Sequence, residues 1–298
     1  MSEFLASALV AFREAFEAVL LVSIIIMLLK KIGASDRIKF TYLSSAVSVL
    51  IGLALGGAIY YIFRGFPEQA LVEAGLSYLA AAVITTVIVW GVRHGPTIKQ
   101  EIESKLAQSL TPIGVTIVTF IFVFREVLET VLITAPYALT APLSTLSGVG
   151  VGTVAALILG VLVYMVGLRV NLRTFFLGTS ILLAFIASGL VGYGTHELFE
   201  WFEDRGVSLG PIENKIVFLD VGENSLMHPS NVIGGILSVM VGYYPYMEIG
   251  RIILQGGVLV ALLAYILTAY GIIGSPRVHP QARSGKASPA GAVEKPVR

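Results

Sequence analysis

FREAFEAVL, residues 12–20, reappears as FREVLETVL at residues 124–132, with six of the nine positions identical. Each copy lies within a long apolar run and carries an Arg-Glu-x-x-Glu motif, which places three charges in that run. A charged side chain at the centre of a bilayer costs roughly 3 kcal/mol on insertion scales, so such charges indicate a functional site. The rest of the chain is interpreted as a scaffold that holds these two motifs.

The composition indicates a polytopic membrane protein. Of the 298 residues, 56% are hydrophobic and 13% are charged, whereas a soluble domain has about 25% charged residues. The apolar residues come in runs of about twenty, the length that crosses the hydrocarbon core as a helix. The net charge of +1 gives no electrostatic reason to expect a nucleic-acid partner, and the absence of cysteine excludes disulfides, thiolate metal sites and cysteine catalysis.

We predict an all-α fold of seven transmembrane helices in the lipid bilayer, at roughly 4–29, 40–63, 70–92, 111–134, 148–168, 174–193 and 249–273. The apolar piece 232–241 is too short to cross and is interpreted as a re-entrant or interfacial segment. The linker 95–110 is expected to form a short surface helix. The membrane domain then covers 1–274, with an acidic outer loop at 194–231 and a basic, disordered cytoplasmic tail at 275–298.

The distribution of Lys and Arg predicts the orientation of these spans. Fourteen of the 20 Lys and Arg residues fall on one side of the membrane, in the segments 30–39, 93–105, 169–173 and 277–298. The other side has three, and the remaining three lie within the spans. Because positive residues accumulate in cytoplasmic loops, we expect the N-terminus outside and the C-terminus in the cytoplasm, in the plasma membrane of the cell.

The duplicated motif belongs to a longer internal repeat. The second and fifth predicted spans each carry small residues at every fourth position, which lets a neighbouring helix approach closely; these are Ser44, Ser48, Gly52 and Gly56, then Gly148, Gly152, Ala156 and Gly160. Repeat one would cover about 4–92 and repeat two about 111–193. Because each repeat has three spans, an odd number, the two copies must be inverted across the membrane, as in many transporters.

The spacing within each motif places its charges on one helix face. Glu14 and Glu17 are three residues apart, and Arg13 and Glu17 are four apart, so all three can interact. Arg125, Glu126 and Glu129 repeat this arrangement. If the two helices cross, four carboxylates and two guanidinium groups meet with a net charge of −2, which favours protons or a cation.

Clustered carboxylates without thiolate or imidazole suit a hard cation, and charge counting leaves a divalent or a trivalent ion equally open. The motifs have two other interpretations. In the first, the Arg-Glu ion pairs serve only to hold helices together, although this leaves one glutamate of each motif unpaired in hydrocarbon. The arginines could bind an anion, but the excess of carboxylates argues against it.

Two Arg-Glu-x-x-Glu motifs, in the first and fourth of seven spans, resemble the high-affinity iron permease family of fungi and bacteria. His196-Glu197-Leu198 followed by Glu200 is similar to the stretch that ends the family's sixth span, and Gly242-Tyr243 followed by a proline is similar to its late Gly-Tyr segment. The resemblance covers residues 4–273. The family usually has Gly-Leu between its paired glutamates, where this chain has Ala15-Phe16 and Val127-Leu128, so metal preference stays open.

The resemblance implies that the chain moves iron into the cytoplasm and is not an enzyme. By this resemblance Glu14, Glu17, Glu126 and Glu129 would be iron ligands, with Arg13 and Arg125 as their charge partners. Iron would be the transported substrate, with no prosthetic group. An external oxidase or an iron-delivery protein would be a partner.

The outer stretch 196–204 is predicted to be an amphipathic helix, on which His196, Glu197 and Glu200 share a face. With Asp220 these residues could capture cations at the mouth of the pathway, or they could form an ordinary solvated acidic face.

Two alternative functions stay open: a permease for manganese or lead, and a membrane-embedded metal-dependent enzyme. Carboxylate-bridged metal enzymes usually add histidines as Glu-x-x-His, whereas all four histidines here lie at predicted span ends, in loops or in the tail.

Overall fold

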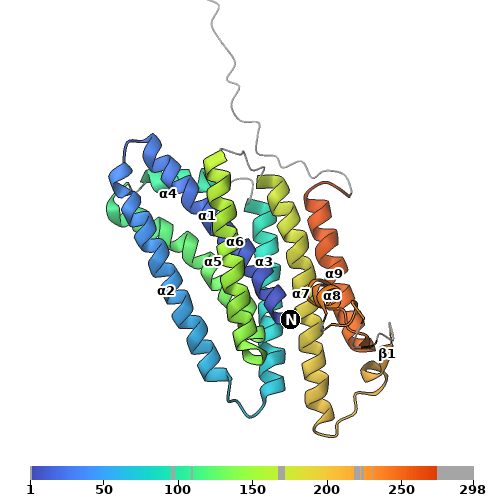
Figure 1. Cartoon of the computed structure of the whole chain (residues 1–298). Helices are drawn as coiled ribbons and strands as arrows, with labels where there is room; N and C mark the ends of the chain where they lie inside the picture. Colours follow the sequence, from blue (N-terminus) through green and yellow to red (C-terminus); the bar gives the residue numbers. More distant parts are fainter. Residues whose placement is uncertain are drawn as a thin grey trace, which may run out of the picture.

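The computed structural model describes residues 2–94, 98–108, 110–166, 172–217, 222, 225–229 and 231–273. This part of the chain is almost entirely α-helical (Figure 1). Its helices are α1 (Ser2–Lys31), α2 (Ile38–Phe63), α3 (Gln69–His94), α4 (Ile98–Gln108), α5 (Pro112–Thr140), α6 (Pro142–Val166), α7 (Leu172–Glu203), α8 (Val232–Val241) and α9 (Ile249–Ala269). Two 3-10 turns, η1 (Ser35–Arg37) and η3 (Gly210–Glu213), and an antiparallel pair of strands, β1 (Lys215–Val217) and β2 (Tyr246–Glu248), complete it.

Each of the seven predicted spans falls on one long helix, and the all-α prediction is confirmed. Five of these helices, α2, α3, α6, α7 and α9, are long and apolar enough to cross a membrane. The other two, α1 and α5, have the length but carry the three charges of a motif. The predicted linker helix is α4, and the short apolar piece forms α8. The predicted tail lies outside the described residues.

The predicted span 174–193 and the predicted outer helix 196–204 form one element, because α7 continues without a break as far as Glu203. Gly192 and Gly194, which lie where the predicted span ends, both serve close packing. A Cβ atom on Gly192 would lie 2.1 Å from Gln255 Oε1, and one on Gly194 would lie 3.1 Å from the carbonyl oxygen of Ala74. The glycines therefore let α3 and α9 approach α7, and the helix passes through them.

The second helix of each repeat packs on the first helix of the other repeat. In α6, Cβ atoms on Gly148 and Gly152 would lie within 2.3 Å of backbone oxygens of α1. In α2, a Cβ atom on Gly52 would lie 2.0 Å from Val127 Cγ1 of α5. The predicted small-residue ridges are thus the surfaces on which α1–α6 and α2–α5 meet, and α1 also contacts α5 directly.

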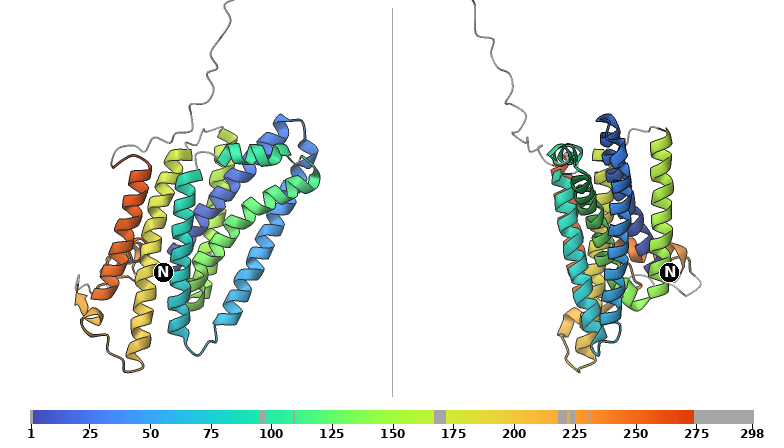
Figure 2. Two further views of the ribbon diagram at one scale, coloured as in Figure 1. Left: turned by 180° about the vertical axis from the view of Figure 1, so that it is seen from behind. Right: turned by 90° about the vertical axis from the view of Figure 1, so that its left-hand side faces the viewer.

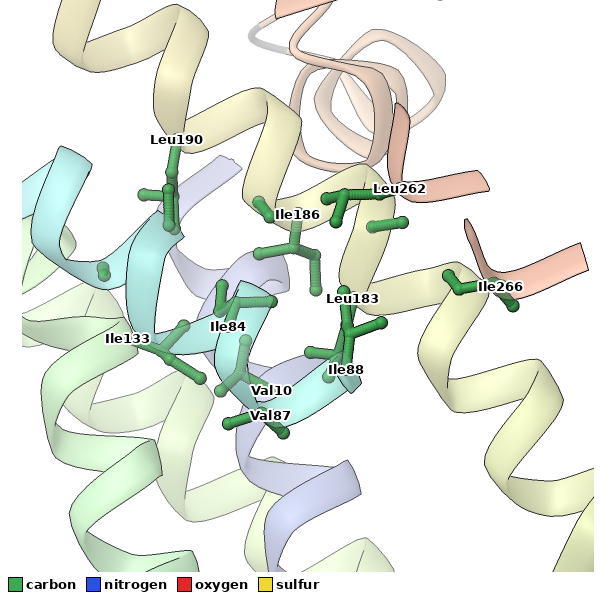
Figure 3. Close-up of a cluster of buried hydrophobic side chains, with 14 of the residues drawn as sticks. Val10, Ile84, Val87, Ile88, Ile133, Leu183, Ile186, Leu190, Leu262 and Ile266 are labelled. Atoms are coloured by element: carbon green, nitrogen blue, oxygen red, sulfur yellow. The ribbon is translucent and has the colours of Figure 1, made fainter. Parts of the chain in front are cut away.

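The two motif helices lie in the middle of the bundle. Figures 1 and 2 show α1 and α5 between α6 on one side and α3 on the other, with α2 at the edge. The largest apolar cluster lies behind them and joins α1, α3, α5, α7 and α9 (Figure 3). Lipid tails are as apolar as these side chains, so the cluster contributes by tight packing rather than by the hydrophobic effect. It gives α1 and α5 a rigid support on the side of α3.

The close approach of α6 to α1 gives a testable expectation for Gly152. Gly152→Ala places a Cβ atom 2.2 Å from the Ala8 oxygen and 2.9 Å from the Phe12 nitrogen, both backbone atoms that cannot turn away. We expect a loss of about 1–3 kcal/mol of stability, the usual cost of overpacking, measured as a lower melting temperature of the purified protein in detergent.

Gly150→Ala is the matched control, because a Cβ atom on Gly150 of the same helix would meet nothing within 4 Å. Alanine favours a helix over glycine, so this variant should melt at the same temperature or higher. Equal melting temperatures for the two variants would show that α6 does not depend on this contact.

Candidate functional site

The two motifs meet where α1 crosses α5. Glu14 of α1 and Glu126 and Glu129 of α5 each place a carboxylate oxygen within 4.8 Å of the other two, and all three side chains are buried. Because the helical spacing puts each glutamate on the face toward the other helix, residues 112 positions apart in the sequence become neighbours. Among the described residues this is the one group of three or more acidic or histidine side chains close enough to share a metal ion.

Arg13 binds carboxylates of both motifs. Its guanidinium group lies 2.5 Å from Glu14 Oε1 and 2.7 Å from Glu17 Oε1, both on α1, and 3.8 Å from Glu129 Oε2 on α5. The Arg13 side chain is only 4% exposed. The expected pairing with Glu17 is therefore present, but Arg13 also joins the two helices. Glu17 forms an ion pair with this arginine and is not one of the three carboxylates that could share an ion.

Arg125 is placed differently from its counterpart. It donates from Nε to Glu129 Oε1 at 2.8 Å, and its guanidinium carbon lies 3.6 Å from the centroid of the Trp90 ring on α3. Its side chain is 28% exposed, so the cation is held partly by the indole face and partly outside the cluster. As a result Glu126 has no ion pair with a basic side chain in the described part of the chain.

The cluster has unused capacity for a cation. One oxygen each of Glu14, Glu126 and Glu129 is buried and makes no hydrogen bond within the described residues. Buried carboxylate oxygens are normally paired, so oxygens without a donor mark a place for a proton or a metal ion. Four carboxylates against two guanidinium groups leave a formal charge of −2, and the donor set is entirely oxygen, which a hard cation prefers.

A second buried polar group, which the sequence analysis missed, lies between α3 and α7. Glu73 of α3 is 5% exposed and accepts hydrogen bonds from Tyr193 Oη at 2.5 Å and Gln69 Nε2 at 2.9 Å. A glutamate within a predicted apolar span was the sequence signal that could have identified Glu73.

The contact of Trp90 with Arg125 had no sequence signal, because an aromatic residue near a span end is expected at the membrane surface.

The predicted capture residues of the outer stretch differ in burial and in their partners. His196 Nδ1 lies 2.9 Å from Glu248 Oε1 at the start of α9, Glu197 is half-buried, and Glu200 is exposed. Burial alone would raise the pKa of Glu248, but hydrogen bonds from His196 and from its own backbone outweigh burial and hold this pKa below its usual range. The predicted capture residue Asp220 lies outside the described residues.

Long apolar helices surround a buried, oxygen-only cluster with excess negative charge, and acidic residues inside a membrane bundle commonly mark ion pathways. The sequence profile of the Iron permease FTR1 family matches residues 4–268, and the chain belongs to this family. It is therefore a multi-pass membrane protein with iron permease activity, a transporter rather than an enzyme, as predicted.

Individual relatives agree with this family. An uncharacterised protein of Archaeoglobus fulgidus is 38% identical over 273 residues, 91% of this chain and 97% of the relative. The ferrous iron permease EfeU of Yersinia pestis is 28% identical over 214 residues, 67% of this chain and 76% of the relative. EfeU of Escherichia coli is 30% identical over 190 residues, 61% of this chain and 69% of the relative. No solved structure matches the chain.

The different settings of the two arginines predict different effects on stability. Arg13→Gln leaves Glu14 and Glu17 as buried carboxylates without their cation, and breaking a buried pair costs about 3–5 kcal/mol. Arg125→Gln removes a partly exposed cation from one carboxylate and should cost much less. The measurement is thermal unfolding of both variants in the same detergent.

Arg13→Gln combined with Glu17→Gln should recover part of the loss, because it removes one of the orphaned charges. If Arg125→Gln destabilises the protein as much as Arg13→Gln, the two arginines are equivalent and the asymmetry described above has no energetic meaning.

Proposed function

We propose that this chain carries ferrous iron across the plasma membrane into the cytoplasm, through the carboxylates of Glu14, Glu17, Glu126 and Glu129. The observation that carries the proposal is the group formed by Glu14, Glu126 and Glu129, whose oxygens approach within 4.8 Å in a buried place and are not all hydrogen-bonded. Glu17 is the next carboxylate along α1, and Arg13 links it to the group.

The charge count alone does not choose between a divalent and a trivalent ion, but the burial of the cluster favours a divalent ion. A cluster with net charge −2 becomes neutral when it binds Fe²⁺, and a neutral complex is the least costly one in a low-dielectric interior. The relatives named as ferrous iron permeases support the same oxidation state. Manganese and lead, the alternative cargoes, are also divalent, so they are the competitors against which iron must be tested. An outer oxidase or iron-delivery partner stays a prediction from the resemblance.

We infer that α1 and α5 also cross the membrane, which gives seven spans in two inverted repeats plus α9. The exchange of partners between the repeats supports this, because α6 packs on α1 as α2 packs on α5. Three charges in each of these helices are tolerable because the bundle surrounds them. The N-terminus would face outside, and His196, Glu197 and Glu200 would collect ions there.

Iron uptake into liposomes that contain the purified protein tests the proposal. Glu17→Ala, Glu126→Gln and Glu129→Ala should each lower the initial rate of Fe²⁺ uptake at least tenfold, because each removes a charged oxygen ligand from the path. Uptake is followed with an iron-quenched dye inside the liposomes, and Mn²⁺ and Pb²⁺ are assayed in the same way.

Glu101→Gln is the matched control, since Glu101 is a partly exposed residue of α4 that pairs with Lys105 away from the cluster. It should transport at the normal rate. Normal uptake by both Glu17→Ala and Glu129→Ala, in protein that is still folded, would refute the proposed path. Faster uptake of Mn²⁺ or Pb²⁺ than of Fe²⁺ would refute the proposed cargo.

The absence of cysteine from the natural sequence allows a clean test of orientation. Val207 follows α7, Ser35 follows α1, and both side chains are exposed. In intact cells a membrane-impermeant thiol reagent should label Val207→Cys and should label Ser35→Cys only after the cells are opened. The reverse pattern would invert the topology and the direction of transport.

A further inference from the structure

Two buried hydroxyl groups repeat at the same distance from the two motifs. Ser7 precedes Glu14 by seven residues, and Thr119 precedes Glu126 by seven residues, so the two hydroxyl residues are 112 positions apart, as the motifs are. Both side chains are 0% exposed. Neither hydroxyl oxygen has a hydrogen-bond partner in the described part of the chain.

The missing partners are unusual for hydroxyl groups in helices. Ser and Thr in such helices commonly donate to the carbonyl oxygen four residues earlier, as Thr130 and Thr134 do on α5 itself and Ser48 does on α2. The hydroxyls of Thr41, Ser77 and Thr145 also have no hydrogen-bond partner among the described residues, but they lie on helices without motif charges. Ser7 and Thr119 are therefore the hydroxyls on the motif helices whose lone pairs are buried and unused.

The helix geometry places each hydroxyl on the same helix face as a glutamate of the motif, about two turns away from it. Residues seven apart lie on the same face of a helix and are separated by about 10 Å along its axis. Ser7 therefore shares a face with Glu14, and Thr119 shares a face with Glu126. Because α1 and α5 run in opposite directions (Figure 1), Ser7 and Thr119 lie on opposite sides of the cluster, Ser7 toward the start of α1 and Thr119 toward the start of α5.

We propose that Ser7 and Thr119 are ligands on the ion path, one on each side of the carboxylate cluster, and that their oxygens coordinate the iron ion as it enters and leaves. The proposal rests on the proposed function of the cluster. A hard cation accepts neutral hydroxyl oxygens as well as carboxylates. A neutral oxygen binds it more weakly than a carboxylate does, which suits a position that must release the ion.

The test uses Thr119→Val, which replaces the hydroxyl by a methyl group of nearly the same size. We expect Fe²⁺ uptake into liposomes to become about tenfold slower, with equal Fe²⁺ binding by the purified protein and a melting temperature that does not fall. Thr119→Ser keeps the hydroxyl and should transport at close to the normal rate. Ser7→Ala should slow uptake in the same way as Thr119→Val.

Ser48→Ala is the matched control, because Ser48 is a buried serine whose hydroxyl donates to the Ser44 oxygen at 2.9 Å. It should leave uptake unchanged. Normal uptake by Thr119→Val and Ser7→Ala would overturn the proposal, and so would equal slowing by Thr119→Val and Thr119→Ser, which would assign the effect to packing. The glutamate variants separate this proposal from the proposed function. If Glu126→Gln slows Fe²⁺ uptake while Thr119→Val and Ser7→Ala leave it normal, the carboxylate path stands and only the role of the hydroxyl groups is refuted.

Discussion

The arrangement of this protein depends on the ion pairs of Arg13. A guanidinium group and four carboxylates cannot stay in a bilayer-length bundle unless they face one another, because each unpaired charge would be strongly destabilising. Arg13 reaches two carboxylates on α1 and one on α5. The crossing of these helices is thereby fixed, and the small-residue ridges of α6 and α2 let their partner helices cover the crossing closely.

The two copies of the motif are alike in sequence and unlike in surroundings. Arg13 is enclosed by carboxylates, whereas Arg125 lies against the indole of Trp90 and, among the described residues, forms an ion pair with Glu129 alone. The excess negative charge is therefore not shared evenly but is concentrated at Glu126, beside Glu14. The crossing of α1 and α5 brings the two copies together. Trp90 of α3 holds the Arg125 cation beside Glu129, so Glu126 is left without an ion pair among the described residues.

Much of this could be predicted from the sequence, because hydrophobic length and charge in apolar runs are local signals. The positions of the long helices, the small-residue ridges and the pairing of Arg13 with Glu17 followed directly from spacing. The continuity of α7 did not follow, because it depends on the packing of Gly192 and Gly194 against Gln255 and Ala74 on other helices. The contact of Trp90 with Arg125 could not be predicted either, because it depends on how α3 and α5 pack.

In the proposed path, the shared arginine would let the cluster hold a cation and still release it. Arg13 and an iron ion would compete for the same carboxylates, so binding of the ion would loosen contacts that Arg13 makes. Among the described residues of the cluster, Glu126 and the unpaired oxygen of Glu14 would offer ligands without this competition, whereas the unpaired oxygen of Glu129, Oε2, is the one that Arg13 approaches. Passage through a membrane needs sites that bind well enough to admit the ion and weakly enough to let it go. A fully unpaired set of four carboxylates would meet the first requirement and fail the second.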